Sequence, residues 1–276
     1  MDREKLQELC QRHGELLKER QPWEQDWKTL AGYFLPRKCR FIEAGEGSGF
    51  GGLHGGGLRG GGLDSIGIYA MRDLAAGLQG GMTSPARPWF RLSLENKDLE
   101  KSRAVHLWLD KVEEIMRAVL HRSNFYTAVH QLYGELGAFG TGFVFALADN
   151  QGIRFHPLTV GEYCLDTNEY NRVDTVFRNM DMTLRQMVRK FGLPALPEAL
   201  QRMWETPGNW SERFLVTHAV FPRNDRDPDK LDQRNMPFAS VYYMDGAGPG
   251  AGSGAARRAG GGAAGGGAYP HLLSEG

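Results

Sequence analysis

The sequence lacks the features that mark several large classes of protein. Its 276 residues carry 33 Lys and Arg against 33 Asp and Glu, so the formal net charge is zero. This balance disfavours a dedicated, sequence-independent DNA-binding protein, which normally has a net basic surface. No run approaches the roughly 18 apolar residues that a membrane span requires, and the charged start "MDREKLQELC" has no apolar signal region. We therefore expect a soluble intracellular chain that does not contact a membrane.

Cysteine and metal-binding patterns are sparse. The three cysteines, Cys10, Cys39 and Cys164, are far apart and form no CxxC pair. That spacing argues against a disulfide framework or a zinc site and favours reduced thiols. The eight histidines form no HExxH motif, and we interpret His106 and His130 as surface or hydrogen-bonded core residues. The sequence predicts no metal site and no cofactor.

Catalytic motifs are equally scarce. The glycine-rich stretch 45–63 has no GK[ST] ending for a P-loop, and it follows no strand, as a dinucleotide-binding fingerprint would. Asp149, Asp166 and Asp174 occur at or beside expected turns, where aspartate is favoured for its local hydrogen bonds. A catalytic carboxylate pair among them, assisted by His156, is kept as an alternative that would make the chain an uncharacterised hydrolase. The favoured interpretation is that the protein is not an enzyme.

The apolar pattern predicts an ordered α+β protein. The hydrophobic fraction of 41% is sufficient for a packed core. Leu6 and Leu16 belong to one helical face, and Pro22 either breaks this helix or separates two helices. Further helices are expected after the glycine-rich stretch, over 102–120 and over 123–140. They are followed by β-hairpins and short helices without regular βαβ alternation, which favours α+β over a doubly wound fold.

Residues 246–276 depart from this pattern. They are low-complexity sequence rich in glycine, alanine and arginine, so we expect a disordered tail after an ordered domain of residues 1–245. Within that domain, the stretch 45–63 is expected to be a flexible surface loop. The strand-like "SVYYMDG" runs directly into the tail. One hypothesis is therefore that the tail is out-of-frame sequence belonging to a longer chain.

A proline-containing corner follows the glycine-rich stretch. "DSIGIYAMRDLAAGLQGG" predicts a capped helix, and "TSPARPWF" then combines two prolines with Trp89 and Phe90, after which "WFRLSL" is typical of a short strand. The two aromatic side chains are large enough to anchor the corner in a core. In the alternative, Trp89 and the flanking Arg87 and Arg91 form a basic-aromatic patch for nucleic acid. We favour the core anchor. Downstream, "GAFGTGF" is interpreted as a helix C-cap with close backbone packing.

This helix and corner resemble the signature region of bacteriophage head-to-tail connector proteins, the portal proteins of short-tailed phages. Three other stretches resemble the same family in the same order: "RQPWEQDWKTLAGYFLPR", "SNFYTAVHQLYGELGAFGTGFVFA" and "GEYCLDTNEYNRVDTVFRNMDMTLRQMVRKFG". The resemblance covers residues 1–245. It assigns structural signature positions to Trp23, Pro36, Arg37, Asp64, Ser65, Leu78, Ser84, Pro85, Arg87, Pro88, Trp89, Phe90, Gly140 and Gly142.

The resemblance implies a structural function. Copies of the subunit would form a ring, a dodecamer in this family, at one capsid vertex. The ring would nucleate capsid assembly, contact terminase, scaffold and tail adaptor proteins, and pass double-stranded DNA without sequence specificity during packaging and ejection. The expected location is the virion, with the host cytoplasm during assembly.

The resemblance also implies that part of the subunit is not visible in this sequence. Family members are longer, and their later part carries the stem helices, the clip and the loops that line the DNA tunnel. The resemblance is therefore to the outer, wing-like portion of the subunit. A truncated, non-functional prophage remnant is the alternative within this family.

Overall fold

The computed structural model describes residues 3–42, 65–96, 99, 102–149, 152–224, 226–227, 229–230, 232, 235–244 and 271–275. The chain divides into two compact units. Unit 1 comprises Met1–Lys28, Arg40–Gly57 and Gly161–Gly276, and unit 2 comprises Thr29–Cys39 and Leu58–Val160. The loop predicted over 45–63 lies outside the described residues. Helices and separate antiparallel sheets together confirm the α+β fold class.

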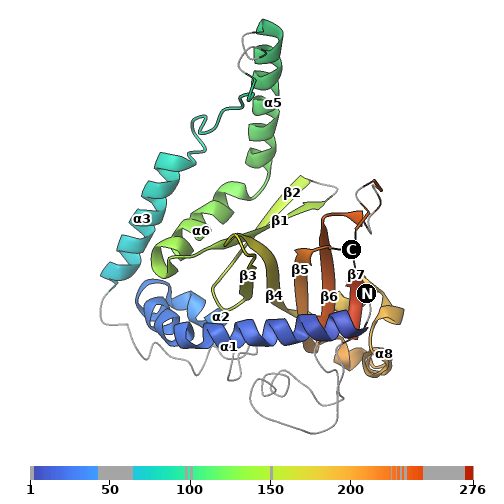
Figure 1. Ribbon diagram of the computed structural model, residues 1–276. Helices are drawn as coiled ribbons and strands as arrows, with labels where there is room; N and C mark the ends of the chain where they lie inside the picture. Colours follow the sequence, from blue (N-terminus) through green and yellow to red (C-terminus); the bar gives the residue numbers. More distant parts are fainter. Residues whose placement is uncertain are drawn as a thin grey trace. The chain divides into compact units, whose positions relative to one another are not determined.

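A five-stranded antiparallel sheet forms the centre of unit 1 (Figure 1). Its strands lie in the order in which they follow along the chain, so no crossover connection is needed. They are β3 (Tyr163–Thr167), β4 (Val173–Thr183), β5 (Arg213–Pro222), β6 (Phe238–Met244) and β7 (His271–Glu275). The central strands are rich in β-branched and aromatic residues, which suit a pleated surface buried on both sides.

The first part of helix α1 (Arg3–Phe34) covers one face of this sheet (Figure 1). Leu6 and Leu16 pack against Phe177 and Tyr243 in a buried cluster. The predicted apolar face of this helix is therefore confirmed. Of the two alternatives at Pro22, the single helix is the one found, with the proline inside it.

Short helices cover the opposite face of the sheet. They are α7 (Leu184–Phe191), η3 (Leu193–Ala195), α8 (Glu198–Trp204) and η4 (Pro207–Ser211). Leu184, Met187 and Leu196 pack against Val216 and Met244 in a second buried cluster. The sheet of unit 1 thus has a core on each side.

Unit 2 is mainly helical. It contains α3 (Ile66–Met82), α5 (Arg103–Arg122), α6 (Phe125–Phe139) and a hairpin of β1 (Phe143–Asp149) and β2 (Gly152–Leu158), together with η1 (Pro36–Lys38). The one-turn helix α2 (Cys39–Ile42) follows η1 at the boundary between the units. Helices α3 and α6 pack against each other through Ala75, Val129 and Tyr133. Among the described residues, no helix combines the length and apolar character needed to cross a membrane.

Two sequence predictions need correction. The stretch "WFRLSL" forms no strand, and it continues as irregular chain after the corner. The tail predicted over 246–276 is not wholly disordered, because residues 271–275 form β7 and pair with β6. The physical reason is that "HLLSE" supplies Leu272 and Leu273, which the low overall apolar content of the tail concealed. Residues 246–270 lie outside the described part of the chain.

Candidate functional site

The proline-containing corner is held to α6 by a cluster of aromatic side chains. Trp89 stacks on Phe125 with ring centroids 5.8 Å apart and an angle of 4° between the rings, and its indole Nε1 donates to the Tyr126 hydroxyl at 3.3 Å. Phe90 packs edge-on against Trp89 at 4.8 Å, and Phe125 packs edge-on against Phe155 of β2 at 5.1 Å. Trp89 and Phe90 are nevertheless half-buried. The predicted core anchor is therefore a partly exposed aromatic cluster on the surface of α6.

Backbone contacts complete the corner. Arg87 Nη2 donates to the Gly80 carbonyl at 3.0 Å and so satisfies an orphan acceptor in the last turn of α3. Ser84 Oγ accepts from the Ala86 amide at 3.3 Å, a local turn contact. Pro85 and Pro88 are exposed. Arg87 thus stabilises the end of α3.

The glycines after α6 permit close approach. Gly140 ends the helix in the left-handed conformation with φ of 72°, which confirms the predicted C-cap. A Cβ at Gly142 would lie 2.5 Å from Leu132 Cδ1, and one at Gly137 would lie 2.8 Å from Leu74 Cδ2. Any larger residue at these two positions would have to displace the neighbouring leucine. The close packing predicted for "GAFGTGF" is therefore also found.

The other signature positions are spread over both units. Trp23 lies in α1 of unit 1 and is 59% exposed. Pro36 and Arg37 form the 3-10 turn η1, with Arg37 exposed. Ser65 occupies the N-cap of α3 without a capping bond from its side chain, and Leu78 packs against the cluster between α3 and α6. Asp64 lies outside the described residues.

Asn124 ties the start of α6 to β2. Its Nδ2 donates to the Phe155 carbonyl at 2.6 Å, and its Oδ1 accepts from the Phe155 amide at 2.9 Å. The side-chain amide therefore makes the two hydrogen bonds that a neighbouring strand would make. This pair holds the hairpin beside the aromatic cluster.

A buried ionic cluster lies at the other end of α6. Glu135 is buried, and its Oε1 contacts Lys38 Nζ at 3.2 Å and Thr159 Oγ1 at 3.0 Å. Burial raises the pKa of Glu135, while Lys38 and the hydroxyl of Thr159 act in the opposite direction. Removing one partner of such a buried pair is expected to destabilise, because the other charge is left without compensation. The cluster thus fixes η1, α6 and the end of β2 to one another.

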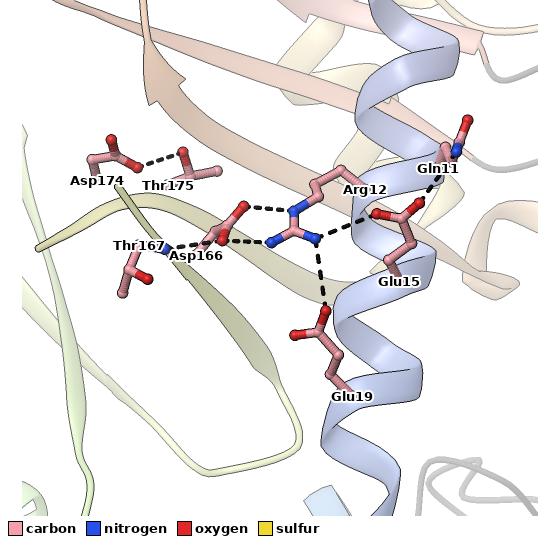
Figure 2. Close-up of polar contacts among 8 residues, drawn as sticks. All are labelled: Gln11, Arg12, Glu15, Glu19, Asp166, Thr167, Asp174 and Thr175. Atoms are coloured by element: carbon pink, nitrogen blue, oxygen red, sulfur yellow. Dashed lines mark hydrogen bonds and ion pairs between the residues drawn. The ribbon is translucent and has the colours of Figure 1, made fainter. Parts of the chain in front are cut away.

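In unit 1 the polar counterpart is an ion-pair clamp between α1 and β3 (Figure 2). Arg12 Nε and Nη2 each donate to a different carboxylate oxygen of Asp166, both at 2.7 Å. Glu15 and Glu19 contact the same guanidinium at 3.3 Å and 3.7 Å. The hydrogen bonds from Arg12 hold the pKa of Asp166 below its usual value. Figure 2 shows both oxygens of Asp166 directed at the guanidinium.

The candidate catalytic carboxylates Asp166 and Asp174 each have a hydrogen-bond partner. Asp166 is an anion engaged by Arg12, and Asp174 accepts from the hydroxyl of its neighbour Thr175 at 2.9 Å. Asp149 is the last residue of β1 in unit 2, where the exposed His156 lies in β2. A carboxylate with a lowered pKa that is already bound at both oxygens is poorly suited to exchange protons near neutral pH.

Buried histidines also have structural partners. His218 Nδ1 accepts from Arg178 Nε at 2.8 Å, and its Nε2 lies 2.9 Å from Ser240 Oγ. Because Nδ1 is the acceptor, a neutral ring carries its proton on Nε2 and donates to the serine. Burial, with the nearby Arg178, lowers the pKa of His218 to about 3. The ring therefore cannot act as a base towards Ser240. His130, whose Nδ1 lies 2.9 Å from Gln79 Oε1, is hydrogen-bonded as predicted.

Comparison with known proteins places this geometry in a family. The family described as "Bacteriophage head to tail connecting protein" matches residues 6–255. The chain is 41% identical over 240 residues to the "Probable portal protein" of Bordetella phage BPP-1, which covers 87% of this chain and 42% of the relative. It is 34% identical over 239 residues to the "Portal protein" of Salmonella phage epsilon15, covering 86% of this chain and 42% of that protein. The chain belongs to the head-to-tail connecting protein family.

Membership in the head-to-tail connecting protein family confirms the resemblance inferred from the sequence. The chain spans 42% of the length of these two relatives, so the match is to a part of a longer subunit. Both units lie mostly inside the matched residues 6–255, whereas β7 lies beyond them.

Several residues that organise this connector chain were not identified from the sequence. Arg12 is one of many charges on α1, and its partner Asp166 lies 154 residues further along. Nothing local distinguishes it. Glu135 did leave a signal, because it is a single charge in the otherwise apolar stretch "LYGELGAF". Such an isolated charge on an apolar helix face indicates a buried partner.

Proposed function

We propose that residues 1–245 form the wing-like portion of a phage portal subunit. The subunit assembles with copies of itself into a ring, a dodecamer, at one vertex of the capsid. Its function is structural and non-catalytic. Membership in the head-to-tail connecting family and 41% identity to a probable portal protein support this role.

The observation that carries the proposal is the uncovered apolar surface of unit 2. On α5, Trp108 is 62% exposed and Ile115 is 52% exposed, although Leu109 on the adjoining strip of the same helix is buried. On α3, Ile66 and Tyr69 are also mostly exposed. Large apolar side chains grouped on the surface of a soluble protein mark sites of protein contact. We assign these two helices to the contacts between neighbouring subunits.

The two helices present different surfaces, which suits a ring. The exposed side of α5 carries the bulky Trp108 and Ile115 beside the exposed ion pair of Lys111 and Glu114. The exposed side of α3 carries Asp73 near Gly77. A Cβ at Gly77 would meet nothing within 4 Å, so space is open there. A contact between unlike surfaces is heterologous, and a heterologous contact closes into a ring when its rotation permits.

The proposed partners follow from the position at the vertex. The ring contacts the terminase, capsid or scaffold proteins and tail adaptor proteins, and double-stranded DNA passes through it without sequence-specific contacts. The assembled protein resides in the virion, after assembly in the host cytoplasm.

Negative-stain microscopy and light scattering of the purified chain test this proposal. We expect rings for the unaltered chain and a shift to monomers for the Trp108→Ala/Ile115→Ala double variant. The matched control is Tyr170→Ala in unit 1, where Tyr170 is 75% exposed on the turn before β4. Its rings should persist. An unaltered chain that remains monomeric would favour the prophage remnant, and a double variant that assembles normally would reject α5 as the contact surface.

A further inference from the structure

Strand β7 occupies the edge of the unit 1 sheet, although it lies outside the family match. The match ends at residue 255, whereas β7 spans His271–Glu275. The strand that receives it, β6, lies inside the match. The open edge of β6, which lies inside the family match, is therefore paired with a strand that lies outside the match.

The pairing places one leucine in each core of unit 1. Leu272 lies opposite Tyr243 and packs against the cluster beneath α1. Leu273 is 5% exposed and belongs to the cluster beneath α7 and α8. The register shifts between Tyr242 and Tyr243, so an irregularity in the ladder accommodates the second leucine. Adjacent side chains on an extended segment point to opposite faces of a sheet. Two adjacent apolar residues can therefore enter the two cores that lie on either side of β6.

We propose that the edge of β6 is a peptide-binding site for an extended segment with two adjacent apolar residues. In this chain, residues 271–275 fill it as a tethered ligand. When that segment is disabled, the same edge accepts the same segment from a second copy of the chain. Backbone hydrogen bonds of the strand supply affinity, and the two leucine sites supply selectivity, as in other cases of strand addition.

A labelled peptide tests the site in the full-length chain. The probe is a fluorescein-labelled peptide with the sequence of residues 269–276, YPHLLSEG, followed by fluorescence anisotropy. The acceptor is the Leu272→Asp/Leu273→Asp double variant, in which the tethered segment can no longer enter either core. The unaltered chain serves as the blocked control, and a peptide carrying both aspartates serves as the control ligand.

We expect the double variant to bind the peptide at least tenfold more tightly than the unaltered chain does. The tethered segment competes at an effective concentration on the order of millimolar. Equal binding by both proteins, or no binding to a folded double variant, would overturn the proposal. Peptide binding to the double variant and to the unaltered chain does not depend on ring formation. The result therefore tests this proposal separately from the proposed portal function.

Hydrogen exchange on the unaltered chain tests the same idea if the double variant does not fold. A replaceable ligand strand opens by itself, so the amides of 271–275 should exchange at least tenfold faster than those of β5, after correction for intrinsic rates. Equal protection of β7 and β5 would show that β7 is an integral part of the sheet, and the proposal would fail.

Discussion

Unit 1 and unit 2 differ in how completely their apolar side chains are covered. In unit 1, helices lie on both faces of the sheet, and Phe177, Val216 and Tyr243 are fully buried. In unit 2, α3 and α6 pack together through a small cluster, while α5 leaves Trp108 exposed. The difference indicates that unit 1 is stabilised by its own core, whereas the described part of unit 2 leaves large apolar side chains exposed, and under the proposed function these would contact neighbouring subunits.

The largest expected effect is a loss of core in unit 1. Phe177→Ala removes a fully buried ring that stacks on His13, and it should lower the free energy of unfolding by about 3–5 kcal/mol. Denaturant unfolding followed by circular dichroism measures the change. Phe238→Ala is the matched control, because that ring is 50% exposed at the start of β6, and its cost should be below about 1 kcal/mol. Similar losses in the two variants would refute the described core.

The pH dependence of local stability should have opposite signs at β5 of unit 1 and at α6 of unit 2. Burial lowers the pKa of His13 to about 4 and that of His218 to about 3, both from 6.5. Below pH 6.5 the unfolded chain therefore binds protons that the folded chain does not, and unit 1 loses stability as the pH falls towards 4. Glu135 in unit 2 has a raised pKa, so its contribution becomes more favourable as the pH falls through that value.

Amide hydrogen exchange of β5 and α6 between pH 7 and pH 4.5 separates these contributions. His218→Gln should reduce the acid sensitivity of β5, by roughly 2 kcal/mol over that interval, and Glu135→Gln should remove the opposing trend in α6. His156→Gln, at an exposed position in β2, is the control that should change neither. Parallel pH profiles of β5 and α6 would contradict the assignment.

A smaller effect is expected at the aromatic corner of unit 2. Trp89 is half-buried, so Trp89→Ala should cost about 1–3 kcal/mol, below the range for a fully buried aromatic side chain. Thermal and denaturant unfolding report the loss. Trp89→Phe keeps a ring to stack on Phe125 and should recover most of it. A cost above that of Phe177→Ala would show that the corner, and not the sheet of unit 1, dominates stability.

Much of the fold could be predicted because it depends on local patterns. The apolar face of α1, the helix over 103–122 and the C-cap at Gly140 each follow from residues close together in sequence. The clamp between Arg12 and Asp166 could not be predicted, since it joins residues far apart and exposed charges of both signs are common on helices. The half-burial of Trp89 was also missed, because aromatic content indicates an anchor but not how much covers it.

The sequence also could not predict which part of α5 is exposed and which part is buried. Its apolar stripe predicts a helix packed along its length, but the width of a stripe says nothing about which side finds a partner within the chain. Leu109 is buried, whereas Trp108 on the same helix is mostly exposed. Strand β7 was not predicted because Leu272 and Leu273 contribute little to the average apolar content of the long glycine-rich segment 246–276.

Few other residues could replace Asn124 at the start of α6. Its amide must offer an N–H to one atom of Phe155 and a carbonyl to another, at 2.6 Å and 2.9 Å. Aspartate would bring a negative charge against the Phe155 carbonyl, and glutamine would be one carbon too long. Replacement of this asparagine by either residue would therefore weaken the attachment of the hairpin to the start of α6.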